Sequence, residues 1–246
     1  QEVSCVACSG VAVCLGSEGS VQVFGGKTGR LLSNSSVVSL HGTGVLTRDS
    51  SDSECGLLYA VDATTSTALL LALTASHDAV TQLASAALSN NNNNTVVVSA
   101  AALHTSLFAA LGTSLSRLHV TTSHQLLVVG SVRAPFVVTA VTASSLSDVL
   151  VWTTPVTSAA SLACWRWQSD DTLLPLSVFS SLPPAVTAPL ALSAPLSFAV
   201  FSTRHLWLLD ASSGNSSAVL QLPSDFVPQQ PSVASRTGVC VCGNAS

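Results

Sequence analysis

Short runs of apolar residues, separated by Gly, Ser, Thr, Asn and Asp, are the main pattern along this chain. The first clear run, Val11–Leu15, is bounded by a glycine on each side. The next, Ser20–Phe24, alternates polar and apolar side chains and leads into a glycine-rich break at 25–29. Strands of about four to eight residues bounded by turn residues have this pattern. The segment therefore predicts a strand, a turn and a second strand beginning at Arg30.

The same strand–turn–strand pattern recurs along the chain. Its predicted turns lie at residues 25–29, 62–67, 121–124, 168–171 and 210–217. If Val23, Val61, Val120, Trp167 and Leu209 are taken as equivalent, the intervals between them are 38, 59, 47 and 42 residues. They average near the period of about 40–50 residues that propeller blades show. Further strands are predicted at 95–100, 126–130, 136–141, 149–153 and 197–202.

The predicted fold class is all-β, a β-propeller or a propeller fragment of about five four-stranded blades. Only 8% of the residues are charged, against about 25% in ordinary soluble proteins. Amphipathic helices need a strongly polar face toward water, whereas Ser, Thr and Asn suit strands and turns. Stacking small sheets around an axis buries both faces of each sheet and leaves only short edges.

A single domain or fragment is expected over residues 1–246. The polar Asn-rich stretch near 88–95 predicts a disordered loop, and the Pro-rich stretch near 182–195 predicts a long crossing loop. The chain begins with Gln1 and contains no Met, so a fragment or processed form is expected. The strands near Val3 and Cys242 either share one blade or belong to a larger propeller.

Composition also limits the classes of partner that the chain is expected to bind. The net charge is −4 and there is no basic stripe of the kind that neutralises phosphates, which argues against nucleic acid. The longest apolar stretch, Ala68–Leu73, is far below the roughly 18 residues of a membrane span. We therefore expect no direct membrane insertion by this segment, and partners that are other protein subunits.

Glycosylation sequons begin at Asn34, Asn93, Asn215 and Asn244. Each has Ser or Thr at the third position, which is the acceptor pattern of secreted and lumenal proteins. Chance alone would give about two in a chain this rich in Ser and Thr. The sequons favour residence in the endoplasmic reticulum (ER) lumen over the cytoplasm, and the cytoplasmic alternative stays open.

Seven cysteines occur, so at least one has no partner within the chain. A disulfide among Cys5, Cys8, Cys240 and Cys242 is one prediction. A zinc site is an alternative, but residues three apart in a strand point to opposite faces, so Cys5 and Cys8 need an intervening turn to share an ion. Buried free thiols are the third interpretation.

No catalytic, cofactor-binding or metal-binding residues are predicted. Gly26-Lys27-Thr28 lacks the earlier glycine of a phosphate-binding loop and fits a hairpin turn better. A Gly-x-Ser-x-Gly elbow is absent, and no histidine pair has the spacing of a metalloprotease helix. His119 and His124 flank a predicted turn, where they are interpreted as surface or turn residues.

Trp165 and Trp167 are the remaining candidates for a binding role. They share one face of a predicted strand, where two large aromatic side chains could form a patch for a protein partner. The alternative interpretation places them in the core between blades.

Two predicted turns resemble those of WD40-like and quinoprotein-like propellers, where a strand is followed by Asp, two residues, Thr or Ser, and Gly, with leucines beyond. Residues 209–214 fit, with Asp210 expected to hydrogen-bond the turn backbone and Gly214 to supply a positive φ. Residues 24–32 also fit, except that Phe24 stands in place of the Asp, with three residues instead of two between it and Thr28.

Within that superfamily the layout resembles the lumenal propeller of subunit one of the ER membrane protein complex. The combination of weak blades, sequons and cysteines carries this resemblance. It implies a non-catalytic scaffold, part of a larger membrane protein, that supports membrane-protein insertion without a redox cofactor. The alternatives are a cytosolic WD40-type interaction platform and a propeller enzyme of hydrolase or quinoprotein type.

Overall fold

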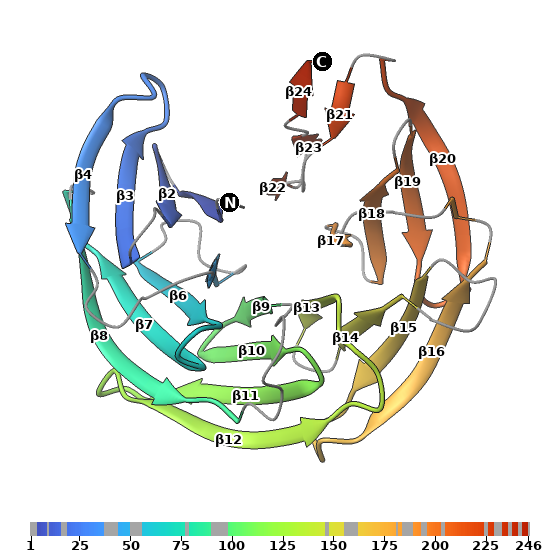
Figure 1. Ribbon diagram of the computed structural model, residues 1–246, viewed down its shortest axis with the longest axis horizontal. Coiled ribbons are helices and arrows are strands. Elements are labelled where there is room, and N and C mark those ends of the chain that lie inside the picture. Colours follow the sequence, from blue (N-terminus) through green and yellow to red (C-terminus); the bar gives the residue numbers. More distant parts are fainter. Residues whose placement is uncertain are drawn as a thin grey trace. The chain divides into compact units, whose positions relative to one another are not determined.

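In the computed structural model, nearly all of the described residues lie in β-strands or in the turns that join them (Figure 1). The described residues are 4–8, 10–15, 19–36, 44–49, 56–76, 79–89, 98–145, 148–154, 162–180, 182–183, 189–192, 196–202, 205–223, 226–228, 233–235, 238–240 and 243–245. The chain divides into two compact units, Gln1–Pro135 and Phe136–Ser246.

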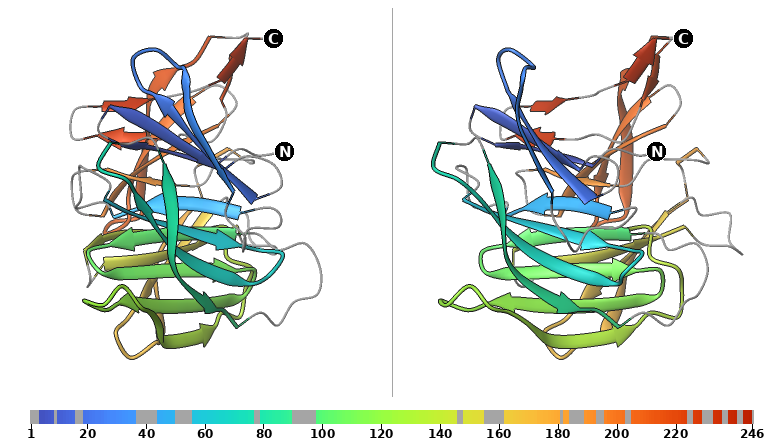
Figure 2. Two further views of the ribbon diagram at one scale, coloured as in Figure 1. Left: turned by 90° about the vertical axis from the view of Figure 1, so that its left-hand side faces the viewer. Right: turned by 60° about the vertical axis from the view of Figure 1, so that its left-hand side comes forward.

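The first unit contains three four-stranded antiparallel sheets, here called blades 1 to 3 (Figure 2). Blade 1 consists of β1 (Cys5–Cys8), β2 (Val11–Leu15), β3 (Ser20–Gly25) and β4 (Leu31–Ser36). Blade 2 consists of β5 (Gly44–Arg48), β6 (Leu57–Asp62), β7 (Thr67–Leu73) and β8 (Val80–Ala87). Blade 3 consists of β9 (Val98–Leu103), β10 (Ser106–Leu111), β11 (Ser114–Val120) and β12 (Leu126–Arg133).

The second unit contains blades 4 and 5 and some short strands. Blade 4 consists of β13 (Ala140–Ser145), β14 (Asp148–Thr153), β15 (Leu162–Trp167) and β16 (Leu173–Phe179). Blade 5 consists of β17 (Leu190–Ala191), β18 (Ser197–Phe201), β19 (His205–Asp210) and β20 (Asn215–Gln221). The short strands pair as β21 (Phe226–Pro228) with β24 (Gly243–Ala245), and β22 (Val233–Ser235) with β23 (Gly238–Cys240).

Five four-stranded meanders of this kind are blades of the β-propeller type, and the predicted all-β fold class is confirmed. In each blade the strands are hydrogen-bonded in chain order, so the first and the fourth strand form its two edges. Blade 1 is built from one continuous segment, Cys5–Ser36. Among the described strands, β1 pairs with β2 and not with a strand near Cys242.

Blade 2 shows why two buried faces give the chain its short, continuous apolar runs. Leu58 and Ala60 of β6 pack in a cluster with blade 1, whereas Tyr59 and Val61 pack in a cluster with blade 3. All four side chains are fully buried. Because successive residues of a strand face opposite sides, a strand buried on both faces has no polar alternation left, and its sequence reads Leu-Leu-Tyr-Ala-Val.

A third cluster packs blade 4 against blade 5 around the fully buried Trp152. Its ring lies 4.8 Å from Phe198 in an edge-on arrangement and 6.1 Å from Phe179. The indole N–H of Trp152 donates to the hydroxyl oxygen of Thr142 at 2.9 Å. The polar end of this large side chain is therefore satisfied inside an apolar cluster, as burial requires.

A β-bulge in the fourth strand of every blade fixes the true repeat. Two neighbouring residues of the third strand face three of the fourth, and the extra residues are Leu32, Leu83, Val129, Leu176 and Val219. The third-strand residues before each shift are Val23, Leu70, Arg117, Cys164 and Leu206, at intervals of 47, 47, 47 and 42 residues. The period is thus more regular than the sequence pattern indicated.

This register corrects one predicted equivalence. Val61 lies in β6, the second strand of its blade, whereas Val23 lies in β3, a third strand. The turn at Ala63–Ser66 therefore joins the second and third strands. Its local geometry resembles that of the outer turn in blade 5, since Asp62 accepts the N–H of Thr64 at 2.7 Å and Asp210 accepts that of Ser212 at 2.9 Å.

The two predicted loops have different outcomes. Residues 90–95 of the Asn-rich stretch lie outside the described residues, but Leu88 at its start is buried. The Pro-rich stretch 182–195 contains β17, the first strand of blade 5, and a buried Leu182. A strand of two residues among prolines has too short an apolar run to be recognised from the sequence.

Candidate interaction surface

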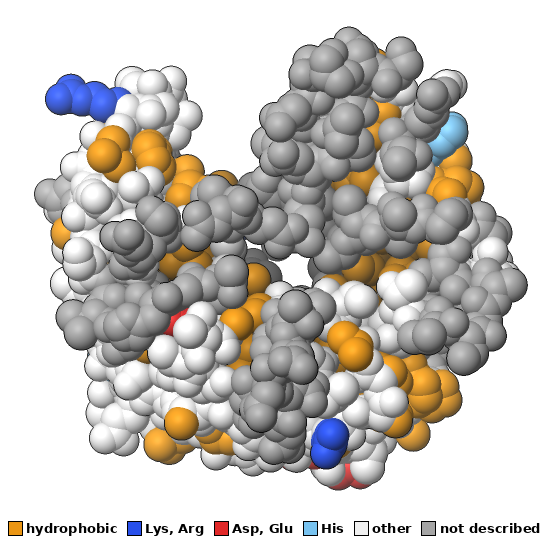
Figure 3. Space-filling view, in the orientation of Figure 1, with side chains coloured by type: hydrophobic (Ala, Val, Ile, Leu, Met, Phe, Trp, Pro, Cys, Tyr) orange, Lys and Arg blue, Asp and Glu red, His pale blue; other side chains and the backbone are white. Residues whose placement is uncertain are grey.

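Large exposed hydrophobic side chains gather on the fourth strands of the blades. Of the twelve found among the described residues, ten lie on β4, β8, β12, β16 and β20. They are Leu31, Leu32, Leu83, Leu127, Val128, Val129, Leu174, Val178, Val219 and Leu220. On the face seen in Figure 3, hydrophobic side chains lie over β16, and charged ones are few. We call the exposed sides of these five strands the outer-strand surface.

The bulges account for part of this exposure. Four of the five extra residues are at least 41% exposed, namely Leu32, Leu83, Val129 and Val219, and Leu176 is half-buried. An extra residue disturbs the pleat, so neighbouring side chains no longer alternate strictly between faces. In β12 the result is three consecutive exposed residues, Leu127, Val128 and Val129. The bulges hinder pairing of these edge strands with strands of other molecules, a task that other proteins often give to charged side chains.

The predicted tryptophan pair contributes little to an exposed surface. Trp167 is 3% exposed, and its indole N–H donates to a carboxylate oxygen of Asp171 at 3.1 Å. Trp165 is half-buried, with its ring 4.9 Å from that of Phe136. The burial of Trp167 matches the interpretation as core, and only Trp165 keeps part of its surface open.

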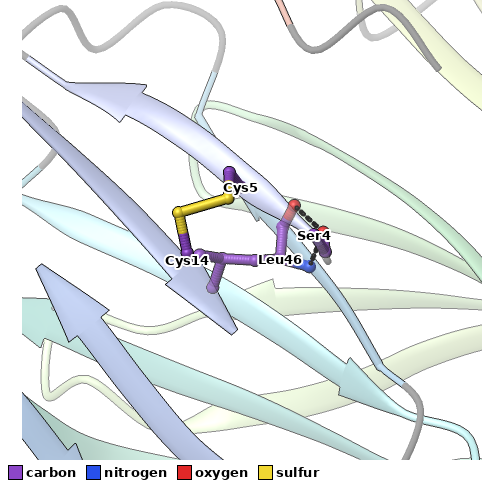
Figure 4. Close-up of a disulfide and its surroundings, with 4 residues drawn as sticks. All are labelled: Ser4, Cys5, Cys14 and Leu46. Carbon is purple, nitrogen blue, oxygen red and sulfur yellow. Dashed lines mark hydrogen bonds between the residues drawn. A yellow bond between two sulfur atoms is a disulfide. The ribbon is translucent and has the colours of Figure 1, made fainter. Parts of the chain in front are cut away.

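The disulfide lies elsewhere than predicted: Cys5 is bonded to Cys14 (Figure 4). The two residues face each other across β1 and β2, with Cα atoms 4.1 Å apart. The neighbouring pair Ser4 and Leu15 is hydrogen-bonded at 2.8 Å. Cys5 and Cys14 therefore occupy a non-hydrogen-bonded pair, where side chains of antiparallel strands come closest. Treating Ser9-Gly10 as a hairpin turn would have predicted this pairing from the sequence.

The other cysteines show no shared site among the described residues. Cys8 is half-buried at the end of β1 and faces Val11. Cys164 is buried in β15, and its burial raises the pKa of the thiol to about 12. Cys240 ends β23, and Cys242 lies outside the described residues.

Two of the four sequons stand on the outer-strand surface. Asn34 is exposed in β4, and Asn215 is exposed at the first position of β20. Asn244 lies in β24, and Asn93 lies outside the described residues. An oligosaccharide needs an exposed acceptor, and Asn34 and Asn215 meet that requirement.

Two titratable side chains with shifted pKa values, those of Asp210 and Tyr59, form hydrogen bonds that stabilise the fold. Asp210 accepts the hydroxyl of Ser212 at 2.5 Å, the hydroxyl of Ser213 at 2.7 Å and the N–H of Ser212 at 2.9 Å, and these bonds lower its pKa to about 2. Gly214 has φ +72°, so both predicted roles in this turn are confirmed. Tyr59 donates to the carbonyl oxygen of His104 at 3.4 Å, and burial, with the nearby charge of Asp49, raises its pKa to about 12.

The remaining candidates are parts of hairpins. Gly26, Lys27 and Thr28 form the turn between β3 and β4, as predicted. His119 is exposed in β11, 3.3 Å from the hydroxyl of Thr105, and His124 lies in the next turn with φ +58°. Among the described residues, no three His, Cys, Asp or Glu side chains gather as metal ligands would. Nor does any described helix have the length and hydropathy needed to cross a membrane.

Comparison with known proteins gives a likeness in structure alone. No protein family matches the chain, and no curated protein matches its sequence. The computationally designed protein Ika8 has a TM-score of 0.58 and 11% identity, over 93% of this chain and 67% of its own. A protein from Lactobacillus plantarum has a TM-score of 0.60 and 10% identity, over 91% of this chain and 70% of its own.

Many solved structures share this likeness, since 874 solved chains match. At identities of 10% and 11%, the two similarities concern the fold alone. Taken with the five four-stranded blades, they place the chain in the β-propeller class of folds.

Proposed function

We propose that the chain is a non-catalytic propeller scaffold whose outer-strand surface binds other protein subunits. The observation that carries the proposal is the gathering of ten large exposed aliphatic side chains on the fourth strands. Within one blade they form a run, as Leu127, Val128 and Val129 do in β12, and exposed apolar surface of this kind on a folded protein marks interaction sites. The non-catalytic part is supported by three of the described aspartates, because Asp62 and Asp210 accept hydrogen bonds within turns and Asp171 accepts one from Trp167.

We further propose that the scaffold resides in the lumen of the endoplasmic reticulum. The disulfide between Cys5 and Cys14 supports this, since such bonds persist in oxidising compartments and are rare in the cytosol. The exposed positions of Asn34 and Asn215 support it as well. The finer proposal is a lumenal domain of a subunit of the ER membrane protein complex that supports membrane-protein insertion. It rests on the resemblance given above.

Two measurements in cells test the compartment. The protein expressed from its own gene should lose mass on glycosidase digestion. The variants Asn34→Gln and Asn215→Gln should each remove one step of that loss. Alkylation before and after reduction should show Cys5 and Cys14 protected until the disulfide is reduced. Digestion without any shift, together with freely alkylated Cys5 and Cys14, would favour a cytosolic interaction platform instead.

Association with other subunits is tested separately. After mild solubilisation of membranes, the chain should sediment as part of a larger assembly. Replacing Leu127 and Val129 by Ser should shift it toward the free form, because both side chains are about half exposed and contribute little to the fold. A matched control is Leu118→Ala in the neighbouring strand, which is fully buried and should lower stability instead. An unchanged sedimentation profile for the surface variant, with the wild-type chain already monomeric, would overturn the scaffold proposal.

A further inference from the structure

The turn between β3 and β4 carries positive charge, although the chain as a whole is acidic. Lys27 and Arg30 are both exposed there, and no Asp or Glu occurs from Ser20 to Ser36. The chain as a whole has a net charge of −4. In Figure 3, blue atoms, the colour of Lys and Arg, project at the end of the β3–β4 hairpin. We call Gly25–Leu32 the basic hairpin tip.

Two leucines adjoin the cations. Leu31 is 47% exposed and Leu32 is 46% exposed, and Leu32 is the extra residue of the β4 bulge. Half-covered apolar side chains next to a pair of positive charges offer both an anchor and a charge contact to a partner. The bulge interrupts regular pairing along β4, so a partner would be held by side chains at this end rather than as an added strand.

Backbone hydrogen bonds fix the shape of the tip. Gly26 donates its N–H to the carbonyl oxygen of Gly10 at 2.8 Å, which ties this turn to the turn between β1 and β2. Within the tip, Gly29 donates to Gly25 at 2.7 Å and Gly25 donates to Arg30 at 2.9 Å. A surface held in one conformation loses less entropy when it binds.

The other described outer turns lack this combination. The turn after β11 (121–125) contains no Lys or Arg. The turn after β15 contains Asp170 and Asp171 and is followed by Leu174, which is 47% exposed. The turn after β19 contains only the charge of Asp210. The basic character therefore belongs to blade 1 and is not a general property of the repeat.

We propose that the basic hairpin tip binds an acidic segment of a partner protein, with Lys27 and Arg30 contacting its carboxylates and Leu31 and Leu32 contacting an apolar side chain. This deepens the scaffold proposal and rests on it. Charge complementarity selects an acidic partner. A lipid surface fits less well, because the apex residues Gly26, Lys27, Thr28 and Gly29 present no apolar side chain to insert.

The test measures fluorescence anisotropy of a labelled peptide made of Glu, Val and Ser, with the full chain as titrant. We expect the acidic peptide to bind, and the same peptide with Lys in place of each Glu not to bind. Reversing both charges, Lys27→Glu with Arg30→Glu, should weaken binding by about tenfold or more. Raising the salt from about 0.05 to about 0.5 M should also weaken it, because exposed charges are screened.

The control for the leucines is taken from blade 4. Leu31→Ser with Leu32→Ser should weaken binding several-fold, whereas Leu174→Ser, at an equally exposed leucine beside an acidic turn, should leave it unchanged. Circular dichroism and thermal unfolding identify any variant that fails to fold. Lys27→Gln with Arg30→Gln, which keeps the polar surface, then replaces a misfolded charge-reversed variant.

Three results would overturn the proposal. Equal binding of the acidic and the basic peptide removes the role of charge. Concentration-dependent self-association that the charge-reversed variant abolishes identifies a second copy as the occupant. Co-sedimentation with phosphatidylserine vesicles, but no peptide binding, identifies a lipid surface. If the full chain still assembles with other subunits and the charge-reversed variant assembles equally well, the scaffold stands and only the role of the tip is lost.

Discussion

The hydroxyl group of Ser4 takes the place of a strand partner for Leu46. It accepts the backbone N–H of Leu46 at 2.9 Å and donates to the carbonyl oxygen of the same residue at 3.4 Å (Figure 4). Leu46 lies in β5, the first edge strand of blade 2, which pairs with β6 on its other side. One side chain just before β1 thus satisfies both backbone groups on a neighbouring blade. It links blade 1 to blade 2, between which the described strands form no ladder.

Replacing that hydroxyl should destabilise the first unit. Ser4→Ala leaves the partly buried N–H and C=O of Leu46 without this partner, and we expect a loss of about 1–3 kcal/mol in the free energy of unfolding. Denaturant unfolding measures the change. Ser4→Thr keeps the hydroxyl group and should retain most of the stability. Equal losses for Ala and Thr would show that packing, and not the hydrogen bonds, is what Ser4 contributes.

The disulfide should stabilise blade 1 through the unfolded chain. Cys5 and Cys14 are nine positions apart, and closing a loop of this size is worth about 3 kcal/mol in the chain-entropy description. Cys5→Ser with Cys14→Ser should therefore lower the free energy of unfolding by about 2–3 kcal/mol. Dithiothreitol should destabilise the wild-type chain to a similar degree and leave the double variant unaffected. If the reductant destabilises both equally, the effect arises at another cysteine.

The fold class could be predicted from the sequence, but the register could not. The apolar runs and turn residues indicated strands because their spacing is local information. The mistaken position of Val61 arose because both faces of blade 2 are buried. Its second and third strands, Leu57–Asp62 and Thr67–Leu73, both read as continuous apolar runs, so either could be taken for the strand before an outer turn. Only the bulges distinguish them, and a bulge is a property of the pairing.

The outer-strand surface was missed for a related reason. Leu127, Val128 and Val129 have the sequence of a core strand, and their exposure follows from the edge position of β12 and its bulge. The disulfide, by contrast, could have been predicted from the spacing of the cysteines in the sequence. Pairing the strand that ends at Cys8 with the strand that begins at Val11 places Cys5 opposite Cys14 by counting, but the strand near Val3 was not joined to Val11–Leu15 as a hairpin. The exposed cations at Lys27 and Arg30 were equally visible in the sequence, as part of a turn without an assigned role.

Tyr59 should make the protein sensitive to alkaline pH. It is the only tyrosine, so tyrosinate absorbance reports this residue alone. Burial, assisted by the negative charge of Asp49, raises its pKa from 10.0 to about 12. The neutral phenol is thus favoured in the folded state, and its contribution to stability is complete below pH 10 and is lost as the pH rises toward about 12. Tyr59→Phe should flatten this decline, and titration of native tyrosine near pH 10 would contradict the assignment.

Asp210 should act in the opposite direction, at acidic pH. Its hydrogen bonds from Ser212 and Ser213 lower its pKa from 3.8 to about 2. The ionised carboxylate is favoured in the folded state, so its contribution is present above about pH 4 and is lost as the pH falls through about 2. Asp210→Asn keeps an acceptor oxygen but not the charge. The stability difference between wild type and variant should therefore shrink between pH 4 and pH 2, whereas a constant difference would point to packing alone.

The contact between two turns in blade 1 makes Gly26 a sharper test of the fold than the other glycines of its hairpin. A Cβ atom added at Gly26 would lie 3.0 Å from the carbonyl oxygen of Gly10 and 3.1 Å from its carbonyl carbon, which are backbone atoms that cannot rotate away. Gly26→Ala should therefore separate the turns and break the 2.8 Å hydrogen bond, at a cost of about 1–3 kcal/mol.

At Gly29 a different feature opposes substitution. A Cβ atom there would meet nothing within 4 Å, but the residue has φ +61°, which residues other than glycine rarely adopt. Gly29→Ala should cost about 1 kcal/mol through backbone strain, without loosening the contact with Gly10. Hydrogen–deuterium exchange separates the two effects. The Gly26→Ala variant should expose the amide of residue 26 to rapid exchange, and Gly29→Ala should leave it protected. Similar protection in both variants would mean that the two turns are not joined in solution, and the rigid basic hairpin tip would lose its structural basis.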